Sequence, residues 1–200
     1  MNYKKVVDFL FGLNEANRSP REGWQRVGVE NPESIAEHTA ICAQIAFVLA
    51  KMEGADAKQA VVLALFHDIG EIRAGDDDLM AQIYHDKNGA ETKARMAQIE
   101  ELFLKDEFSK IFGELDEKNT KEAIIVKDAD LLELAIQAKV YEHSGYRAAL
   151  LFIDGMRNKL KTESAKKLLA EIEKSKIEDW WMAIPEIAVI AKKISGKKYC

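Results

Sequence analysis

Three observations on the sequence predict an all-α protein. Apolar residues recur at the helical spacing of three and four along most of the 200 residues. Residues that break helices are scarce, with only 3 Pro and 11 Gly. No stretch alternates apolar and polar residues for long enough to predict a strand. We therefore expect a helical bundle that forms one domain over residues 1–200, an ordinary length for a single core.

The first part of the chain contains three predicted helices. A helix over about 2–13 is followed by an irregular stretch rich in Gly, Pro and Arg. The second helix begins at Ser34, which forms an S-x-x-E capping box with Glu37, and it ends at Gly54. The third helix is apolar on nearly every face, which predicts that it is buried, and it ends near Asp68.

The rest of the chain continues as helices joined by polar segments. A loop over about 73–87 precedes a helix of about 88–105. Another helix begins after Asn119, which with Glu122 resembles a second capping box, and continues to about 143. Further helical segments are expected near 145–159, 163–175 and 179–193, the last interrupted at Pro185.

Composition and charge indicate a globular protein and give no sign of a nucleic-acid or membrane partner. A chain with 48% hydrophobic and 32% charged residues is typical of globular proteins. The net charge of −5 gives no support to a surface that coats nucleic acid or binds a membrane, because both need basic residues in excess. No signal peptide and no membrane span of ~18 apolar residues is expected. Two cysteines, Cys42 and Cys200, make no disulfide framework, so we expect a cytoplasmic protein.

The third helix ends in a group of ionisable residues. The segment LALFHDIGEIRAGDDD, residues 63–78, places His67 and Asp68 at the inner end of that helix and Glu71 one turn later. A charged Asp buried there is costly unless a cation or a metal pairs with it. A histidine at a helix C-terminus can simply complement the helix dipole, but that explains one residue of the three.

Other polar residues lie on apolar helix faces. His38 lies on the apolar stripe of the second helix, where a core histidine bonded to a backbone carbonyl is the commoner explanation. Asp128 and Asp130 interrupt the apolar helix EAIIVKDADLLELAI and flank its core seam on opposite sides. Periodicity does not decide which of the two would be a ligand. The pair His85-Asp86, by contrast, follows no apolar helix and is assigned to a solvated loop.

Two imidazoles and two carboxylates together suit a divalent transition metal. In an octahedral site they leave two positions for water and a substrate oxygen, and the metal would lower the pKa of that water and polarise a phosphoryl oxygen. Glu71 would be close enough to handle protons. A structural zinc site is the rival, although such sites usually contain more Cys. Cys42, four residues after His38, is interpreted as a small core residue rather than a ligand.

The sequence resembles the HD-domain metal-dependent phosphohydrolases, because His38, His67-Asp68 and a later Asp in KDADLLE match their H…HD…D signature. The segments GWQR, PESIAEH, FHDIGE and AGD extend the resemblance to the YfbR-like 5'-deoxynucleotidases and their HD-domain-containing protein 2 relatives, over about residues 23–133. The resemblance implies a helical bundle of the HD-domain type, usually a homodimer. It also implies hydrolysis of deoxyribonucleoside 5'-monophosphates with one divalent ion, for which Co²⁺, Mn²⁺, Mg²⁺ and Zn²⁺ are the candidates.

The same resemblance implies roles for individual residues. The metal ligands correspond to His38, His67, Asp68 and Asp130, the last because it is the Asp of the Ala-Asp dipeptide. Glu71 and Asp76 correspond to the catalytic acids of the family. Either acid can deprotonate the attacking water, and Glu71 can protonate the leaving 5'-oxygen, so the division of labour between them stays open.

Substrate contacts are assigned to Arg26 and Trp24. The planar guanidinium of Arg26, in GWQRVGV, suits phosphate oxygens. Trp24 can pack against the sugar or base, and it can equally well close the loop onto the bundle as an aromatic plug. In the bacterial enzyme of the YfbR-like family that this sequence resembles, Arg and Trp are adjacent. The order here is Gly-Trp-Gln-Arg, so the selectivity for base and sugar stays open.

We therefore expect an enzyme that acts on a deoxynucleoside monophosphate and has no nucleic-acid or membrane partner. A phosphodiesterase or a nucleotide pyrophosphohydrolase on the same fold is one alternative, although the long basic tracts expected for such substrates are absent. A non-catalytic regulatory protein with a structural metal is the other alternative. Glu71 and Asp76 count against it, because a structural site does not need these acids.

Overall fold

The computed structural model describes residues 1–195, without the side chains of residues 191, 192, 194 and 195. Within this part of the chain the regular structure is helical, and the only β-type pairing is an isolated bridge between Pro20 and Ser34. The all-α prediction is confirmed. Cys200 lies outside the described residues.

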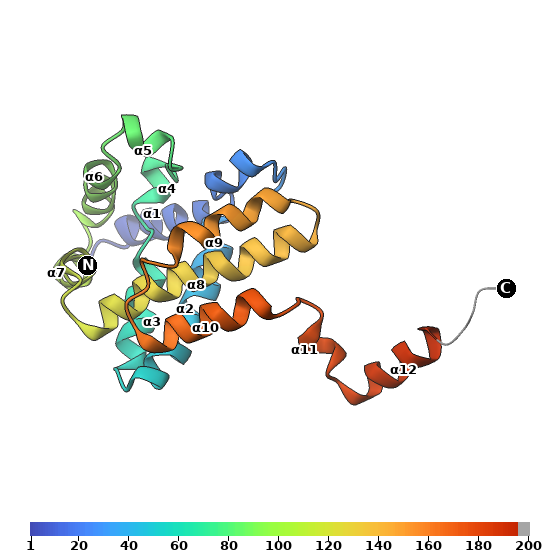
Figure 1. Cartoon of the computed structure of the whole chain (residues 1–200). Helices are drawn as coiled ribbons and strands as arrows, with labels where there is room; N and C mark the ends of the chain where they lie inside the picture. The colour runs from blue at the N-terminus through green and yellow to red at the C-terminus, as the bar shows by residue number, and fades with distance from the viewer. Residues whose placement is uncertain (196–200) are drawn as a thin grey trace.

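The helices follow one another with short connections, and Figure 1 shows their arrangement. Their bounds are α1 Tyr3–Asn14, η1 Glu15–Asn17, η2 Glu22–Val27, α2 Ile35–Glu53, α3 Ala57–Phe66, α4 Glu71–Ala74, α5 Ala81–Tyr84, α6 Lys87–Ile99, α7 Lys105–Glu117, α8 Lys121–His143, η3 Arg147–Leu150, α9 Leu151–Met156, α10 Glu163–Lys174, α11 Asp179–Met182 and α12 Pro185–Ser195, where η denotes a 3-10 helix.

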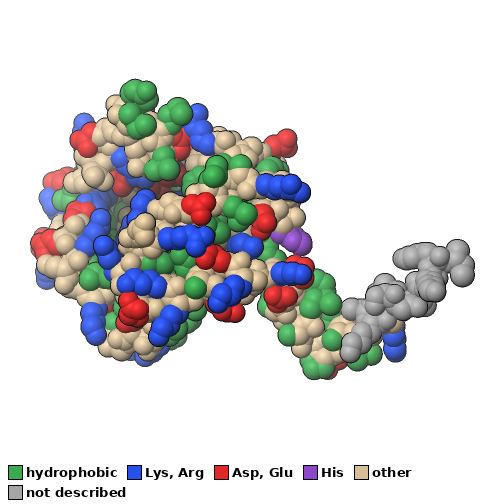
Figure 2. Space-filling model, in the orientation of Figure 1, with side chains coloured by type: hydrophobic (Ala, Val, Ile, Leu, Met, Phe, Trp, Pro, Cys, Tyr) green, Lys and Arg blue, Asp and Glu red, His purple; other side chains and the backbone are tan. Residues whose placement is uncertain are grey.

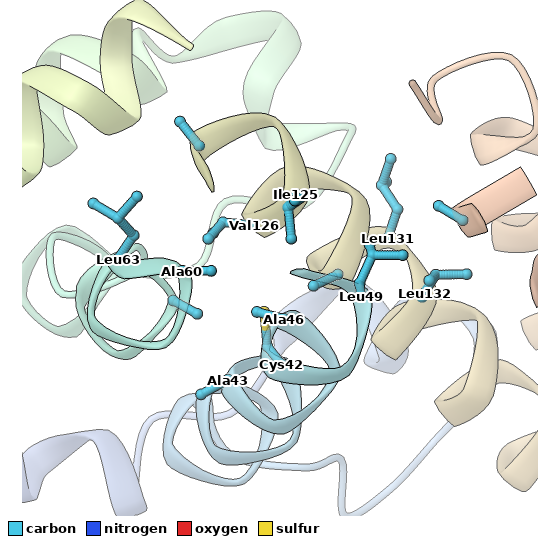
Figure 3. Packing of buried hydrophobic residues seen from close by; sticks show 14 of the residues in the cluster. Cys42, Ala43, Ala46, Leu49, Ala60, Leu63, Ile125, Val126, Leu131 and Leu132 are labelled. Atoms are coloured by element: carbon cyan, nitrogen blue, oxygen red, sulfur yellow. The ribbon is translucent and has the colours of Figure 1, made fainter. Parts of the chain in front are cut away.

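Helices α2, α3 and α8 form the centre of the bundle. Figure 3 shows Ala46 and Leu49 of α2, Ala60 of α3 and Ile125 of α8 around the space between the three helices. Many of the buried residues between α2 and α3 are alanines, which let the two helix backbones approach closely. The site residues on these three helices are therefore held by a well-packed core.

The ends of α2 follow from its sequence. The Ser34 hydroxyl accepts from the backbone N–H of Glu37 at 3.2 Å, and the Glu37 carboxylate accepts from the Ser34 N–H at 2.7 Å. This is the predicted capping box. Gly54 ends the helix with a φ of 66°, a left-handed conformation that glycine adopts without strain.

Helix α2 is also the one described helix that is long and apolar enough to span a membrane. Its residues Cys42, Ala46, Leu49 and Ala50 are completely buried inside the bundle. Helices α3 and α8 cover one side of α2, whereas Ile41, Phe47, Val48 and Met52 are 42 to 54% exposed.

Two predicted boundaries in the second half were wrong. The helix predicted over 88–105 ends at Ile99, and the separate helix α7 was not predicted. Asn119 does not cap α8; the cap is Thr120, whose hydroxyl accepts from the Ala123 N–H at 3.1 Å. Glu122 instead accepts from the backbone N–H of Asp56 at 2.8 Å, and so ties the start of α8 to the start of α3.

After α8 the chain turns back and runs along the same helix. Helices η3 and α9 pack on α8, and residues 161–162 then reach the middle of α8, where their backbone N–H groups donate to Asp128. Figure 1 shows α9 and α10 beside α8. This return path covers the C-terminal half of α8.

Candidate functional site

The four expected metal ligands converge at one point of the bundle. His38 comes from the first turns of α2, His67 and Asp68 directly follow α3, and Asp130 lies in the middle of α8. His38 Nε2 lies 3.3 Å from His67 Nε2, 3.5 Å from Asp68 Oδ2 and 3.4 Å from Asp130 Oδ1. His67 Nε2 lies 3.1 Å from Asp68 Oδ2. Three core helices thus bring together two imidazoles and two carboxylates.

This spacing fits a shared metal ion. Two ligand atoms that bind one ion at about 2.1 Å and at right angles to each other lie about 3 Å apart. The measured separations of 3.1 to 3.5 Å are close to that value. A set of two nitrogens and two carboxylate oxygens suits a divalent transition metal, so the residues present fit such an ion.

The other nitrogen of each imidazole has its own partner. His38 Nδ1 lies 2.6 Å from Glu133 Oε2, and His67 Nδ1 lies 2.7 Å from the carbonyl oxygen of Ala64. Because a carboxylate and a carbonyl only accept hydrogen bonds, both Nδ1 atoms carry the proton. In the neutral form of each imidazole the lone pair is therefore on Nε2, the atom that faces the centre of the site.

The structure separates the two aspartates of α8. Asp128 is fully buried, points away from the site and accepts hydrogen bonds from Lys161 N, Thr162 N and Thr162 Oγ1 at 2.7 to 3.2 Å. Asp130 faces the imidazoles, and Lys127 donates to its other oxygen at 2.7 Å. Although burial disfavours its charge, Lys127 and His38 hold the pKa of Asp130 well below its usual value.

A residue that the sequence did not indicate, Arg21, occupies the centre of the acidic group. Arg21 Nη1 lies 3.0 Å from Asp68 Oδ2 and 3.4 Å from Glu71 Oε2. The same nitrogen is 3.9 Å from Asp76, and Nη2 is 4.0 Å from Asp130. Burial alone would lower the pKa of Arg21, but these carboxylates outweigh it and raise that pKa. Arg21 precedes η2 in an irregular stretch, so no helical periodicity marks it.

Glu71 and Asp76 lie beside this group, on the side of α4. Glu71 is buried, and Lys87 Nζ of α6 donates to its Oε1 at 2.8 Å. Burial, together with the charges of Asp68 and Asp76, raises the pKa of Glu71 to about 8. Asp76 accepts from the backbone N–H of Glu22 at 2.9 Å, which holds it against η2. Both acids therefore face the same space as the four ligands.

The two expected substrate contacts lie further out. Arg26 pairs with Asp78, its side chain is 58% exposed, and it is not part of the cavity wall described below. Trp24 is buried: its indole N–H donates to Glu33 at 2.9 Å, and its ring packs against Tyr141 and Phe152. Its position is that of an aromatic plug between η2, α8 and α9, with one edge at the cavity.

Cys42 lies directly beneath the two imidazoles. Its sulfur and one nitrogen of each of His38 and His67 all lie within 4.8 Å of one another. Cys42 is a free, fully buried cysteine, and burial raises the pKa of its thiol well above the ordinary value. A neutral thiol is a poor metal ligand, so this geometry agrees with Cys42 as a packing residue.

Three of the candidate ligands, His67, Asp68 and Asp130, line a cavity of about 630 Å³, whereas His38 is completely buried. Its walls come from η2, from α4 to α9 and from residues 76–79. Figure 2 looks onto the side of the molecule that carries α8, α9 and α10, where the surface is hollowed between these helices and the α4–α6 group. A small molecule can therefore reach Asp68, Glu71 and Asp130 from solvent.

Comparisons with known proteins agree with this geometry. The family model of the HD domain matches residues 14–173. Human 5'-deoxynucleotidase HDDC2 is 29% identical over 175 residues, which cover 85% of each chain. A conserved hypothetical protein from Pyrococcus furiosus has a solved structure with a TM-score of 0.74 and 32% identity, and the match covers 84% of this chain and 99% of that one.

A more distant structure has the same fold. The HD phosphohydrolase of cyanophage S-2L, solved with dA and one catalytic Zn²⁺ ion, gives a TM-score of 0.56 at 20% identity. That match covers 82% of this chain and 96% of the phage chain. At this identity the likeness is one of fold.

Proposed function

The chain belongs to the HD-domain family, and from this premise we propose that it is a metal-dependent phosphohydrolase. The proposed reaction converts deoxyribonucleoside 5'-monophosphates to the deoxynucleoside and phosphate. The observation that carries the proposal is the convergence of His38, His67, Asp68 and Asp130, of which the last three line an open cavity. The name of the human relative, a 5'-deoxynucleotidase, supports the choice of substrate.

In this proposal His38, His67, Asp68 and Asp130 hold one divalent ion. Such an ion, when bound, lowers the pKa of a water molecule and polarises a phosphoryl oxygen. Co²⁺, Mn²⁺, Mg²⁺ and Zn²⁺ remain candidates, and the Zn²⁺ ion of the phage structure supports a transition metal. The imidazole nitrogens favour a transition metal over Mg²⁺, because Mg²⁺ prefers oxygen ligands.

The phosphate of the substrate needs cations besides the metal, since it brings about two negative charges into a group of carboxylates. We assign this task to Arg21 and Lys87, whose charged groups lie within 4.0 Å of Asp76. The guanidinium of Arg21 presents a planar pair of donors that suits two phosphate oxygens. Arg26, the contact expected from the sequence, is further out and would act only through Asp78 at the mouth of the cavity.

The two acids divide the proton transfers. Burial raises the pKa of Glu71 to about 8, so Glu71 can take up a proton near neutral pH and give it to the leaving 5'-oxygen. Asp76 is held by the Glu22 N–H and keeps one carboxylate oxygen toward the cavity, where it can orient the attacking water and accept its proton. This assignment follows from the different surroundings of the two carboxylates.

The test is phosphate release by metal-stripped protein, supplied in turn with Co²⁺, Mn²⁺, Mg²⁺ and Zn²⁺. The substrates are deoxy- and ribonucleoside mono-, di- and triphosphates and a cyclic dinucleotide. We expect release from deoxynucleoside monophosphates only when a metal is added, and none from the Asp68→Ala variant. Turnover of diesters or triphosphates instead would assign the site to a phosphodiesterase or pyrophosphohydrolase. Tight metal binding without any turnover would contradict an enzymatic role.

The remaining parts of the proposal concern the whole protein. We propose one HD domain over residues 1–200, which acts as a homodimer in the cytoplasm. The family match over residues 14–173 supports one domain. Exposed apolar side chains on α11 and α12, among them Trp180 and Ile190, support association with a second copy.

A further inference from the structure

The cavity extends to both sides of the candidate metal centre along one face of α8. The α8 residues in its wall are spaced by three and four, so they form one stripe of the helix: Ala123, Val126, Lys127, Asp130, Leu131 and Leu134. Asp130 lies inside this stripe, one turn before Leu134. The cavity therefore has an end toward the start of α8 and an end toward its C-terminal half.

The end toward the start of α8 contains charged side chains beside the apolar residues Leu115, Ala123 and Val126. Its wall includes Arg95 of α6, Asp116 of α7, Lys118 and Lys127. Arg95 pairs with Asp116, and Lys127 pairs with Asp130. An uncharged ring placed here would displace water from these charges without replacing their hydrogen bonds, which is unfavourable.

The other end is apolar. It is walled by Leu134 of α8, by Leu151, Phe152 and Met156 of α9, and by Val27 of η2. These side chains carry no hydrogen-bonding group, and Phe152 offers an aromatic ring. Lys159, which follows α9, is the charged residue of the wall on this side. Since four residues of a helix rise by about 6 Å, this end begins about 6 Å along α8 from Asp130. An aromatic ring attached through a short linker to a phosphate at the metal centre would reach it.

One residue in this apolar wall has no side chain. Gly155 of α9 lines the cavity, and a Cβ placed on it would have no other atom within 4 Å. Its φ is not positive, so the helix does not require glycine there. Gly155 is exposed and lines the cavity, so a larger side chain at this position has open space beside it, part of which belongs to the cavity.

We propose that the α9 end of the cavity holds the base of the nucleotide substrate and that the missing side chain at Gly155 keeps this end open. The inference rests on the proposed function for the identity of the substrate. It rests on the structure for the location of the base, because a nucleotide has a charged end and a flat, largely apolar end, and the cavity offers a matching wall for each. Gly155 would then be a specificity-determining residue.

The experiment compares Gly155→Leu with Gly113→Leu. Gly113 lies in α7, a Cβ added to it would likewise meet no atom within 4 Å, and it does not line the cavity, so it is a matched control. Both variants and the wild type are assayed with a deoxynucleoside monophosphate and with 2-deoxyribose 5-phosphate, the same ester without a base. Binding of the deoxynucleoside alone is measured by calorimetry.

We expect Gly155→Leu to raise KM for the nucleotide by about tenfold or more. Its kcat/KM for 2-deoxyribose 5-phosphate should stay within about twofold of the wild type, because the metal centre is unchanged. Its affinity for the deoxynucleoside should fall in parallel with the change in KM. Gly113→Leu should match the wild type in all three measurements.

Two results would overturn the inference. If Gly155→Leu leaves nucleotide KM and deoxynucleoside binding unchanged, the base binds elsewhere. If it reduces turnover of both esters equally, its effect is not on the base. The calorimetric measurement separates this inference from the proposed function. If the wild type has no phosphatase activity, the proposed function is wrong. If Gly155→Leu then still abolishes the deoxynucleoside binding seen in the wild type, the location of the base is supported.

Discussion

Glu133 is the residue that holds His38 in place at the candidate metal centre. Its carboxylate lies 2.6 Å from His38 Nδ1, and both side chains are at most 2% exposed. A buried carboxylate on the far nitrogen of a ligating histidine selects the tautomer, fixes the ring and makes Nε2 a better donor. Glu133 is three residues after Asp130, so one face of α8 supplies a ligand and the partner of another ligand.

Replacing Glu133 by Ala should therefore weaken metal binding although Glu133 is not a ligand. We expect about a 10- to 100-fold loss of Co²⁺ affinity, measured from the visible absorption of the bound ion. Glu133→Gln keeps an acceptor for Nδ1 and should lose less. Equal affinity in the Ala variant and the wild type would show that His38 needs no such support.

Because the pKa of Glu33 is raised in the folded protein, we expect the free energy of unfolding to depend on pH. Burial and the nearby charge of Glu133 raise the pKa of Glu33 to about 7, above the ordinary value of 4.5 that applies in the unfolded chain. The folded state thus binds this proton more tightly, and its contribution to stability is present below pH 4.5 and is lost as the pH rises to about 7. Glu33→Gln imitates the protonated acid and can still accept from Trp24.

Urea unfolding of the metal-stripped protein at pH 5 and pH 8 measures this effect. The free energy of unfolding of Glu33→Gln minus that of the wild type should be larger at pH 8 than at pH 5, by about 1–3 kcal/mol. A stability difference that does not change with pH would mean that Glu33 ionises normally in the folded protein.

Most residues of the candidate metal site can be recognised in the sequence because their positions conflict with local burial. His38, His67 and Asp68 stand out as polar residues on or after apolar helices, and the structure brings them together. The choice between Asp128 and Asp130 depended on resemblance, since both flank the core seam. Arg21 gave no such signal, because it belongs to an irregular segment whose position depends on tertiary contacts.

At the scale of elements, Asp128 anchors α10 to α8. Its buried carboxylate accepts from two backbone N–H groups and one hydroxyl of residues 161–162, at the start of α10. Asp128→Ala leaves these donors unpaired and should lower the free energy of unfolding by about 2 kcal/mol, measured by urea unfolding.

The matched comparison is with Asp130, two residues away on the same helix. Asp130→Ala should abolish metal binding, whereas Asp128→Ala should bind Co²⁺ as the wild type does once folded. If instead Asp128→Ala loses the metal and Asp130→Ala keeps it, the assignment of the two aspartates is reversed.

Helix α7 shows why an element can be missed. Its residues Phe108, Ile111, Phe112 and Leu115 follow the helical spacing, so the periodic signal is present. The start signal is weak, because the N-cap is Leu104, which makes no side-chain hydrogen bond. Its end is also unusual, since Lys118 rather than glycine adopts the left-handed conformation, with a φ of 50°. Long helices with polar caps were easier to predict.

At the scale of the whole molecule, the C-terminal helices lie apart from the bundle. Figure 1 shows α11 and α12 extending away from the other helices. Trp180 is 74% exposed and Ile190 is 55% exposed, which is costly for large apolar side chains in a monomer. The exposure of Trp180, and of Trp181 at 39%, supports the proposed contact with a second copy.

Substitution of both residues tests this association. Sedimentation equilibrium should give a dimer for the wild type and a monomer for the Trp180→Ser/Ile190→Ser variant, because the apolar contact is lost. The control is Lys166→Ser on the exposed side of α10, which should remain a dimer. A monomeric wild type, or a double variant that stays dimeric, would contradict the proposal.

The most direct test of the central claim is the position of the metal. Crystals of the protein loaded with Co²⁺ should give one strong anomalous peak at the cobalt edge, about 2.1 Å from Nε2 of His38 and of His67 and bound also by Asp68 and Asp130. Arg21 should then have moved away from Asp68 to make room for the ion. A peak between Glu33 and Glu133, a peak at Cys42, or full occupancy elsewhere with these four side chains unchanged would contradict the account.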